Sequence, residues 1–378
     1  MSDSKQRHIK FNNKHLKDFS TELHKKVRNY FEENQLSPYA DLSMICKSII
    51  MLILFTGPYI IMVSAHLQMV EMMLLAVVAG VGKAGIGFNI AHDACHSAYS
   101  KHPWVNRILG LSFNMIGMSD YTWKIMHNIY HHTYTNIWEK DEALKETSAM
   151  RFSPDAPKIL MHRYQHIYAL PAYSLYTLSW LFAYDFEKLA RYNGNGSNDE
   201  GIKHPKKELL ILFTSKIMYL TVALIIPIFA LQMNAFVVII CFVLMHLVAG
   251  LLTTIVAQPA HLIQETVHIT PDDDGQIGHS WMMHEMITTT NYGMDNKFLT
   301  WYTGGLNYQI EHHLFPKICS IHYSALSPIV RDLAYHYSIP YHIQPGLWSA
   351  LKAHLSMLKI LGREEYSPKK NAYARKIN

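Results

Sequence analysis

Long stretches of apolar residues are the main pattern along the chain. Four of them reach the roughly 20 residues that a membrane-spanning helix needs. They cover residues 46–66, 69–90, 209–231 and 235–258. Very short segments join the first to the second and the third to the fourth, which predicts two tight transmembrane hairpins. Lys83 and Lys216 lie inside two of these spans, and such lysines either reach toward the membrane surface or face a cavity in the protein.

Two further apolar stretches are weaker. Residues 104–118 are too few to span a membrane and predict a re-entrant or interfacial segment. Residues 166–184 are rich in aromatic side chains and contain Pro171, which favours an interfacial helix, with a fifth span as the alternative. The predicted fold is therefore an all-α polytopic membrane protein with four spans and a helical cap.

The distribution of basic residues predicts the orientation. Nine lysines and arginines lie within the first 47 residues, whereas the two hairpin tips near Gln68 and Met233 carry none. Cytosolic loops carry the excess of basic residues, so both termini and the cap are expected in the cytosol, at the inner membrane if the source is bacterial. Residues 1–45 are predicted as a basic amphipathic segment, 46–345 as the main domain and 346–378 as a tail.

Composition narrows the class of protein. Hydrophobic residues make up 49% of the chain and charged residues 17%, compared with about 25% charged in soluble proteins, which excludes a disordered or fibrous chain. The net charge of +5 suits an anionic membrane surface better than nucleic acid. The four cysteines form no CxxC pair, so neither a disulfide framework nor a zinc knuckle is expected. The N-terminal residues contain no apolar stretch and predict no cleavable signal peptide.

Histidine is unusually frequent, with 24 residues against 29 acidic ones, and many of the histidines are clustered. The clusters are HDACH at 92–96, HNIYHH at 127–132 and QIEHH at 309–313. His261 and His284 lie between the second and third clusters. All of them follow the ends of predicted spans on the cytosolic side, so we expect them to converge on one site.

Helical spacing predicts which imidazoles share a face. His92 and His96 stand at i and i+4, as do His127 and His131, while His132 is turned by about 100° from His131. The third cluster places Gln309, His312 and His313 on one face. Eight to ten such ligands exceed the needs of one ion and suit two, and imidazole binds Zn, Cu, Fe or Ni. A metal transporter is the alternative, but it would place its ligands near the membrane midplane.

The three clusters resemble the histidine boxes of the membrane fatty acid desaturases. GGLNYQIEHHLFP resembles the branch of front-end desaturases and their bacterial acyl-lipid and linoleoyl-CoA relatives. The resemblance extends from about residue 40 to 341 and implies a di-iron centre that uses O₂ and two electrons to insert a cis double bond into a fatty acyl lipid or acyl-CoA. Lipid hydroxylases and sphingolipid-type desaturases share the box pattern and remain alternatives.

The resemblance also implies the roles of individual residues. The catalytic metal ligands would be His92, His96, His127, His131, His132, His312 and His313, joined by His261 and, as weaker candidates, His284 and Gln309. Hydrogen bonds that orient the ligand rings are expected from Asp93, Asn128, Asn136 and Glu311, for which helix capping is the alternative. The scattered histidines, His354 among them, are expected to be interfacial or solvated.

The electron supply is expected to be external. The chain lacks the HPGG haem motif, and 45 residues before the first span are too few for a fused cytochrome b5 domain. Neither haem nor flavin is therefore expected in the chain, and ferredoxin or free cytochrome b5 would deliver the electrons. Lys101, Arg107 and Lys124 are candidates for the docking surface, or they only satisfy the positive-inside rule.

Overall fold

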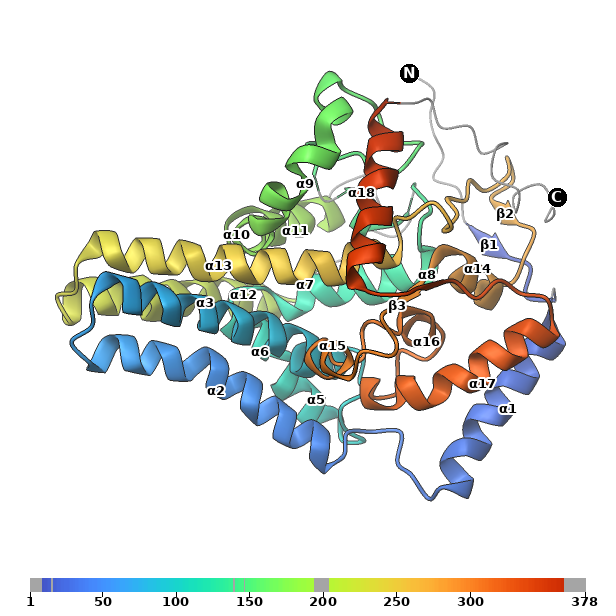
Figure 1. Cartoon of the computed structure of the whole chain (residues 1–378), viewed down its shortest axis with the longest axis horizontal. Coiled ribbons are helices and arrows are strands. Elements are labelled where there is room, and N and C mark those ends of the chain that lie inside the picture. The colour runs from blue at the N-terminus through green and yellow to red at the C-terminus, as the bar shows by residue number, and fades with distance from the viewer. Residues whose placement is uncertain (1–8, 15, 139, 146, 194–203, 364–378) are drawn as a thin grey trace.

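The computed structural model describes residues 9–14, 16–138, 140–145, 147–193 and 204–363 (Figure 1). It is built almost entirely of helices, which confirms the predicted all-α class. Long helices run side by side at one end of the molecule, and shorter helices gather at the other end. The first eight residues of the predicted basic segment and residues 364–378 of the predicted tail lie outside the described residues.

Four helical stretches are long and apolar enough to cross a membrane, and they match the predicted spans within a few residues. They are Leu42–Ser64, Met69–Cys95, Lys206–Ala230 and Ala235–Ala260. Neither 104–118 nor 166–184 is among them, so the part of the chain that is described contains four candidate spans and not five. All four cysteines are free, as expected.

Several of these stretches combine α-helix with π- or 3₁₀-helix. The elements are α2 (Leu42–Ser64), α3 (Met69–Ile86), η1 (Gly87–Ala91), α4 (His92–Cys95), α12 (Lys206–Leu220), η6 (Thr221–Ala230), α13 (Ala235–Ala257) and η7 (Gln258–Ala260). In π-helical η6, Pro227 has no N–H to donate to an earlier carbonyl. The carbonyl of Val222 instead accepts a hydrogen bond from the Tyr59 hydroxyl of α2, at 2.7 Å.

Helix α3 packs against both α2 and α13. A Cβ atom at Gly82 would collide with the backbone of Leu54 in α2, so glycine is what permits this close approach. The two intramembrane lysines face the protein interior. Lys83 donates to the carbonyl of Ile116 and the hydroxyl of Tyr219, and Lys216 forms an ion pair with Asp185.

The segment between the second and third spans consists of short helices. They are α5 (Pro103–Gly110), α6 (Ser112–Met115), α7 (Asp120–Lys124), η2 (Ile125–His131), α8 (His132–Tyr134), η3 (Glu142–Lys145), η4 (Leu160–Tyr164), α9 (Gln165–Ser174), α10 (Tyr176–Ser179), η5 (Trp180–Tyr184) and α11 (Asp185–Asn193). Helices α9 and α10 pack along α13. Residues 166–184 are therefore helical, as expected.

The remaining elements form the cap beside the histidines. They are β1 (Lys10–Phe11), α1 (Lys17–Glu33), β2 (Gln276–Ile277), α14 (Trp281–Thr288), β3 (Asn291–Tyr292), α15 (Lys297–Tyr302), α16 (Gln309–Leu314), η8 (Ser320–His322), α17 (Tyr323–His336), β4 (Ile343–Gln344) and α18 (Leu347–Arg363). The strands pair in parallel, β1 with β2 and β3 with β4.

Helix α1 is amphipathic, as its sequence suggests. Phe19, Leu23, Val27 and Phe31 recur every four residues, and all are buried against α14, α16 and α17. This shared core fixes α16, which carries the third histidine cluster. The N-terminal segment therefore stabilises the cap from the side opposite the long helices.

The region predicted as a tail begins with α18, a folded helix that packs on α9 and η4. Its His354 is fully buried: Nε2 lies 2.6 Å from the Tyr173 hydroxyl and Nδ1 lies 3.0 Å from the Leu262 carbonyl. The expectation of a solvated His354 was wrong, because an amphipathic helix turns this position toward the core. The same correction applies to His162, His246, His268, His279 and His322, which are also buried.

We expect His354→Ala to destabilise the protein by roughly 1–3 kcal/mol, because it removes the hydrogen-bond partner of a buried hydroxyl and a buried carbonyl. Burial lowers the pKa of His354 to about 4, below the usual value near 6.5. The stability that neutral His354 contributes is therefore present above about pH 6.5 and is lost as the pH falls toward 4. Thermal unfolding of the purified proteins across this range should show that the difference in unfolding temperature between wild type and variant becomes smaller as the pH falls.

His66→Ala is the matched control, since His66 is exposed beyond the end of α2. Equal unfolding temperatures for wild type and both variants at pH 7.5 would contradict the structural role of His354.

Candidate metal centre

Eight histidines from the three clusters and from the end of the fourth span meet in one place. Their ring nitrogens form three groups, each with all members within 4.8 Å of one another. The groups are His92 with His96, His127 and His312; His131 with His261 and His313; and His132 with His312 and His313. The structure therefore brings together every box histidine and His261.

The first group joins α4, η2 and α16. His92 and His96 follow the π-helical η1 at the end of the second span, and their ring centroids lie 4.7 Å apart. The ring of His312 from α16 lies 4.5 Å from His92 and 5.0 Å from His96. The predicted shared face of His92 and His96 is confirmed.

The second group joins η2, α16 and the residue that follows η7. The ring centroids of His131 and His261 are 4.7 Å apart, and those of His261 and His313 are also 4.7 Å apart. His132 lies between the two groups, with its ring 4.5 Å from His312 and 4.3 Å from His313. His132 and the adjacent pair in α16 therefore connect the two groups.

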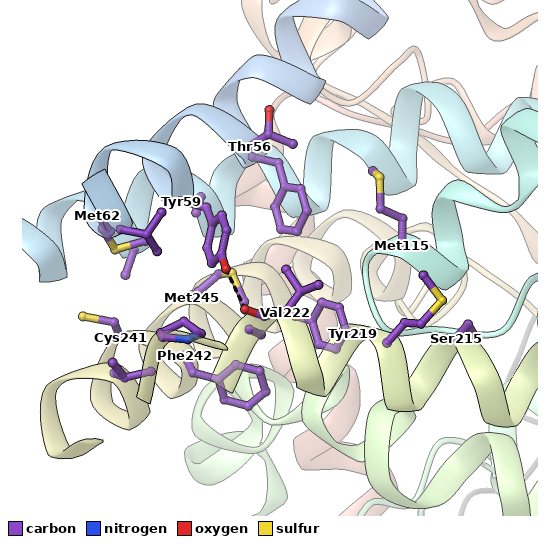
Figure 2. Close-up of a pocket in the computed structure, with 18 of the residues that line it drawn as sticks. Thr56, Tyr59, Met62, Met115, Ser215, Tyr219, Val222, Cys241, Phe242 and Met245 are labelled. Atoms are coloured by element: carbon purple, nitrogen blue, oxygen red, sulfur yellow. Dashed lines mark hydrogen bonds between the residues drawn. The ribbon is translucent and has the colours of Figure 1, made fainter. Parts of the chain in front are cut away.

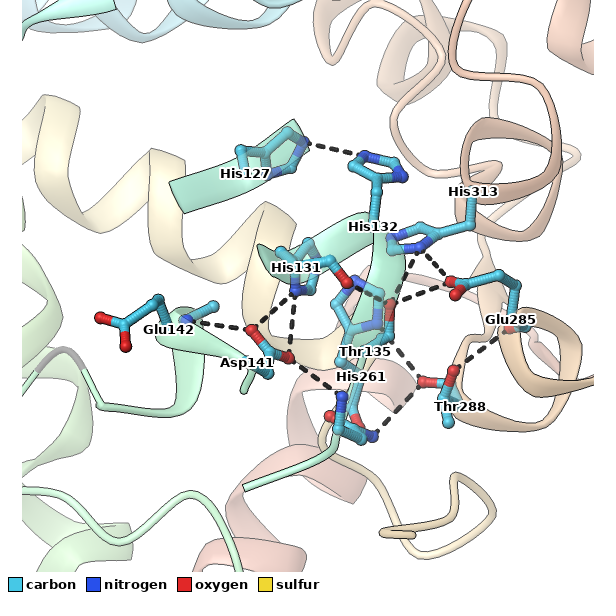
Figure 3. Close-up of polar contacts among 12 residues, drawn as sticks. His127, His131, His132, Thr135, Asp141, Glu142, His261, Glu285, Thr288 and His313 are labelled. Atoms are coloured by element: carbon cyan, nitrogen blue, oxygen red, sulfur yellow. Dashed lines mark hydrogen bonds and ion pairs between the residues drawn. The ribbon is translucent and has the colours of Figure 1, made fainter. Parts of the chain in front are cut away.

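The second cluster departs from the predicted α-helical geometry. Residues 125–131 form the π-helix η2, whose turns are wider than α-helical turns. The i, i+5 pair His127 and His132 consequently lies close, with the two Nε2 atoms 3.1 Å apart, whereas His131 belongs to the other group (Figure 3). His127 and His131 still share a face as predicted, with stacked rings whose centroids lie 5.2 Å apart. The close approach of His132 to His127 was not predicted, and through it the single cluster contributes to all three groups.

Carboxylates from distant segments hold two of the rings (Figure 3). Both carboxylate oxygens of Asp141 lie 3.2 Å from Nδ1 of His131. Oε2 of the fully buried Glu285 lies 2.7 Å from Nδ1 of His313. Such contacts fix the tautomer and direct Nε2 toward a metal.

Neither acid was predicted from the sequence. Asp141 follows the second cluster in the segment WEKDEA, and Glu285 directly follows His284. Each acid lies close to a histidine cluster in the sequence, but no spacing rule identifies it as the partner of a histidine ring. Two other rings are held by groups that sequence reasoning also missed: Nδ1 of His312 lies 3.2 Å from the Tyr323 hydroxyl, and Nδ1 of His261 lies 3.3 Å from the Thr288 carbonyl.

The residues predicted to orient the ligand rings form hydrogen bonds mostly with backbone groups. Asp93 lies 3.4 Å from Nδ1 of His92 and also accepts hydrogen bonds from Ser320. Asn128 donates to the carbonyl of Cys95. Asn136, with a positive φ of 58°, donates to the carbonyl of His261. These three residues therefore tie the clusters to one another.

Neither Glu311 nor His284 is a member of the three groups. Glu311 accepts hydrogen bonds from Asn291 and Tyr341, and burial raises its pKa to about 7. Gln309 donates to the carbonyl of Leu306 and lies near His261.

His284 lies apart from the three groups because both of its ring nitrogens are engaged elsewhere. Nε2 lies 2.7 Å from the Thr135 carbonyl, and Nδ1 lies 3.3 Å from His279. His284 therefore lies outside the three groups, whereas Gln309 lies beside His261, a member of one of them.

Burial keeps six of the eight clustered imidazoles uncharged. Desolvation, followed by the neighbouring imidazoles, lowers the pKa of His96, His127, His132, His312 and His313 well below the usual value near 6.5. Burial also lowers the pKa of His261 to about 3. Neutral imidazole is the form that binds a metal ion.

Several ring nitrogens have nothing to bind within the protein. In the described part of the chain, Nε2 of His96, of His312 and of His313 is buried without a hydrogen-bond partner. Leaving a buried polar atom unpaired is unfavourable unless another ligand satisfies it. Neutral rings with free nitrogens that converge from several helices fit metal ions that prefer imidazole.

A cavity of about 150 Å³ connects the histidines with the interior of the long helices. His92, His127, His131, His261 and His312 line it at one end, and Lys83 and Thr177 line it further along the helices. Its intervening wall is apolar and includes Phe113, Ile116, Trp123, Ala249 and Leu306. The arrangement can hold a hydrocarbon segment next to metal ions and away from water; we name it the histidine cavity.

Comparison with known protein families identifies the family of this chain. Residues 70–345 match the family model described as fatty acid desaturase. The chain belongs to the fatty acid desaturase family. It is therefore an oxidoreductase, and its four long apolar helices fit a membrane protein.

The desaturase is similar to named relatives over most of its length. It is 31% identical to the sn-1 linoleoyl-lipid 6-desaturase of Synechocystis sp., over 94% of this chain and 98% of the relative. It is 33% identical to the protein of the same name from Arthrospira platensis, over 90% of this chain and 92% of the relative. The acyl-lipid (8-3)-desaturase of Physcomitrium patens is 30% identical over 92% of this chain and 72% of its own. These relatives agree with the front-end and acyl-lipid branch that the third box indicated.

Proposed function

We propose that this desaturase holds two iron ions with its eight clustered histidines and inserts a cis double bond into an acyl chain of a membrane lipid. The observation that carries the proposal is the geometry of the histidine cavity. Histidines of both metal-binding groups line one apolar cavity that extends among the membrane-spanning helices.

The division of the ligands follows the three groups. His92, His96, His127 and His312 would hold one ion, and His131, His261 and His313 the other, with His132 between them. When bound, the iron centre supplies the O₂ chemistry that removes two hydrogens from the chain. Two electrons and two protons from outside complete the reduction of O₂ to two water molecules.

The protein's own groups position the ligands and exclude water. Asp141 and Glu285 keep the Nδ1 protons on His131 and His313, so that Nε2 of each ring carries a free electron pair. Phe113, Trp123 and Leu306 form apolar walls that hold methylene groups beside the histidines. A lipid-linked acyl substrate is supported by the names of the relatives, which are linoleoyl-lipid and acyl-lipid desaturases.

The electrons are proposed to come from ferredoxin or a free cytochrome b5 that docks on the cytosolic cap. Within the described residues, Arg107 and Lys124 pair with Asp120, so their charges are partly neutralised. Lys101 remains exposed. This makes Arg107 and Lys124 weaker candidates for the docking surface than Lys101.

Product analysis tests the proposed reaction. Expression in a host of known fatty acid profile should yield new double bonds in lipid-linked acyl chains, located by mass spectrometry. Products that gain one oxygen without losing two hydrogens would identify a hydroxylase instead.

Metal analysis tests the cofactor. We expect about two irons per chain in active protein, because eight imidazoles exceed what one ion coordinates. Elemental analysis of the purified enzyme measures the ratio. Active protein that holds one tightly bound zinc and no iron would contradict the di-iron proposal.

We also propose two membrane hairpins, with both termini and the histidine cap in the cytosol. The four candidate spans return the chain to its starting side, and the basic residues before the first span favour the cytosol. A reporter fused after Asn378 should be active only on the cytosolic side. Activity only on the outer side would contradict the four-span topology.

A further inference from the structure

A second cavity lies among the long helices, away from the histidines (Figure 2). Its volume is about 530 Å³, within the range of small-molecule sites. The side chains that line it are almost all apolar, with Phe55, Met62, Ala76, Met115, Met218 and Met245 among them. Helices α2, α3, α12 and α13, which contribute most of this wall, lie within the candidate spans, so the surrounding solvent is the hydrocarbon of the bilayer. We name this space the outer cavity.

A polar partition separates the outer cavity from the histidine cavity. Lys83 lines the histidine cavity and Tyr219 lines the outer cavity, and Nζ of Lys83 donates to the Tyr219 hydroxyl at 2.9 Å. His246 reinforces the partition, with Nε2 2.9 Å from the same hydroxyl. Ionisable residues are rare in membrane spans and usually have a function there. A chain in the outer cavity would therefore lie behind this partition and would not approach the metal ligands.

The face of α12 that lines the outer cavity also carries a lysine near the start of the helix, outside the cavity lining. Ile211, Thr214, Ser215 and Met218 line the cavity at the three- and four-residue spacing of one helix face. One turn before Ile211, the same face carries Lys207, which is exposed at the start of the span. An ammonium group at the end of an apolar groove suits a lipid whose headgroup is anionic.

We propose that the outer cavity binds a non-reacting acyl chain of an anionic phospholipid, with Lys207 contacting the headgroup. The site is distinct from the proposed reaction site because the partition at Lys83 and Tyr219 separates the two. Its occupation requires no turnover, so it can be tested on the intact protein without the reaction's electron donor.

The chain offers a matched pair of lysines for the test. Lys206 is also exposed and precedes Lys207 by one residue, so it points about 100° away around the helix. The residues one, two and three turns beyond Lys206 are Leu210, Phe213 and Ile217, which are exposed and are not among the residues that line the outer cavity. Lys206→Glu therefore makes the same change of charge beside a different helix face.

The experiment uses the full chain in nanodiscs of phosphatidylcholine with a small fraction of phosphatidylglycerol that carries a diazirine on one acyl chain. After irradiation, mass spectrometry of peptides should locate the label at Met62, Met218 or Met245. We expect Lys207→Glu to lower labelling by roughly fivefold or more, since one lysine near an anionic surface contributes about 1 kcal/mol. Lys206→Glu should label like the wild type.

A second variant tests the cavity without changing a charge. Thr214 is exposed and lines the cavity, so Thr214→Trp should fill part of the space and lower labelling of the same three methionines. Equal labelling of the Lys206 and Lys207 variants, or label spread over Phe213 and Ile217, would overturn the proposal in favour of ordinary surrounding lipid. Label at Phe113 or Trp123 would also overturn it, because these residues line the histidine cavity and would show that the chain is the reacting one.

Discussion

Replacing His312 by alanine is expected to abolish desaturation. His312 belongs to two of the three histidine groups, and its ring packs against both His92 and His132. In the proposed assignment, the substitution removes a ligand of one iron and a close neighbour of the other iron's ligands. The loss of desaturase activity should therefore exceed the roughly 10- to 100-fold that follows removal of a hydrogen-bond partner of a ligand. Product formation per folded enzyme, together with iron content, measures the effect.

The control for this variant is His66→Ala, at an exposed position outside the histidine groups. Both variants must be compared at equal amounts of folded protein, because loss of metal can also destabilise the cap. His354→Ala is unsuitable as a control, since His354 is buried and hydrogen-bonded. Wild-type activity in the His312 variant would require a different set of ligands.

The spans and the box histidines were predictable because each depends on a local pattern. Twenty apolar residues specify a membrane helix almost regardless of the rest of the chain. The spacing of His92 and His96 also predicted their shared face correctly. At the second cluster the local pattern predicted the shared face of His127 and His131 but not the position of His132, because the chain forms the π-helix η2 there. Hydrophobic periodicity does not distinguish a π-helix from an α-helix over seven residues, so the proximity of His127 and His132 could not be foreseen.

The partners of the ligand rings could not be predicted either, because they depend on long-range packing. Glu285 reaches His313 from α14, and Tyr323 reaches His312 from α17. Both helices are positioned by the core that α1 completes, far away in the sequence. The burial of His354 has the same origin, since the amphipathic α18 presents it to α9.

Asp141→Asn is expected to lower desaturation by about 10- to 100-fold, the range typical of a lost partner of a metal-binding histidine. The two carboxylate oxygens of Asp141 face Nδ1 of His131 and also accept from the backbone N–H groups of Asn136 and Ala143. An asparagine would place its own NH₂ group opposite one of these donors. His131 would then lose its fixed orientation, and the iron site that contains it would weaken.

Glu142→Gln is the matched control, because the adjacent residue loses a charge without contacting a histidine. The Glu142 carboxylate points away from the histidines (Figure 3). It accepts from Arg191 at 2.8 Å and lies 3.6 Å from Lys188, so the variant tests an ordinary buried ion pair. Turnover and iron content should both fall in Asp141→Asn, whereas iron per folded chain should stay near the wild-type value in Glu142→Gln. Equal losses in the two variants would show that Asp141 acts only through the stability of the loop, and the orientation of His131 would then need another explanation.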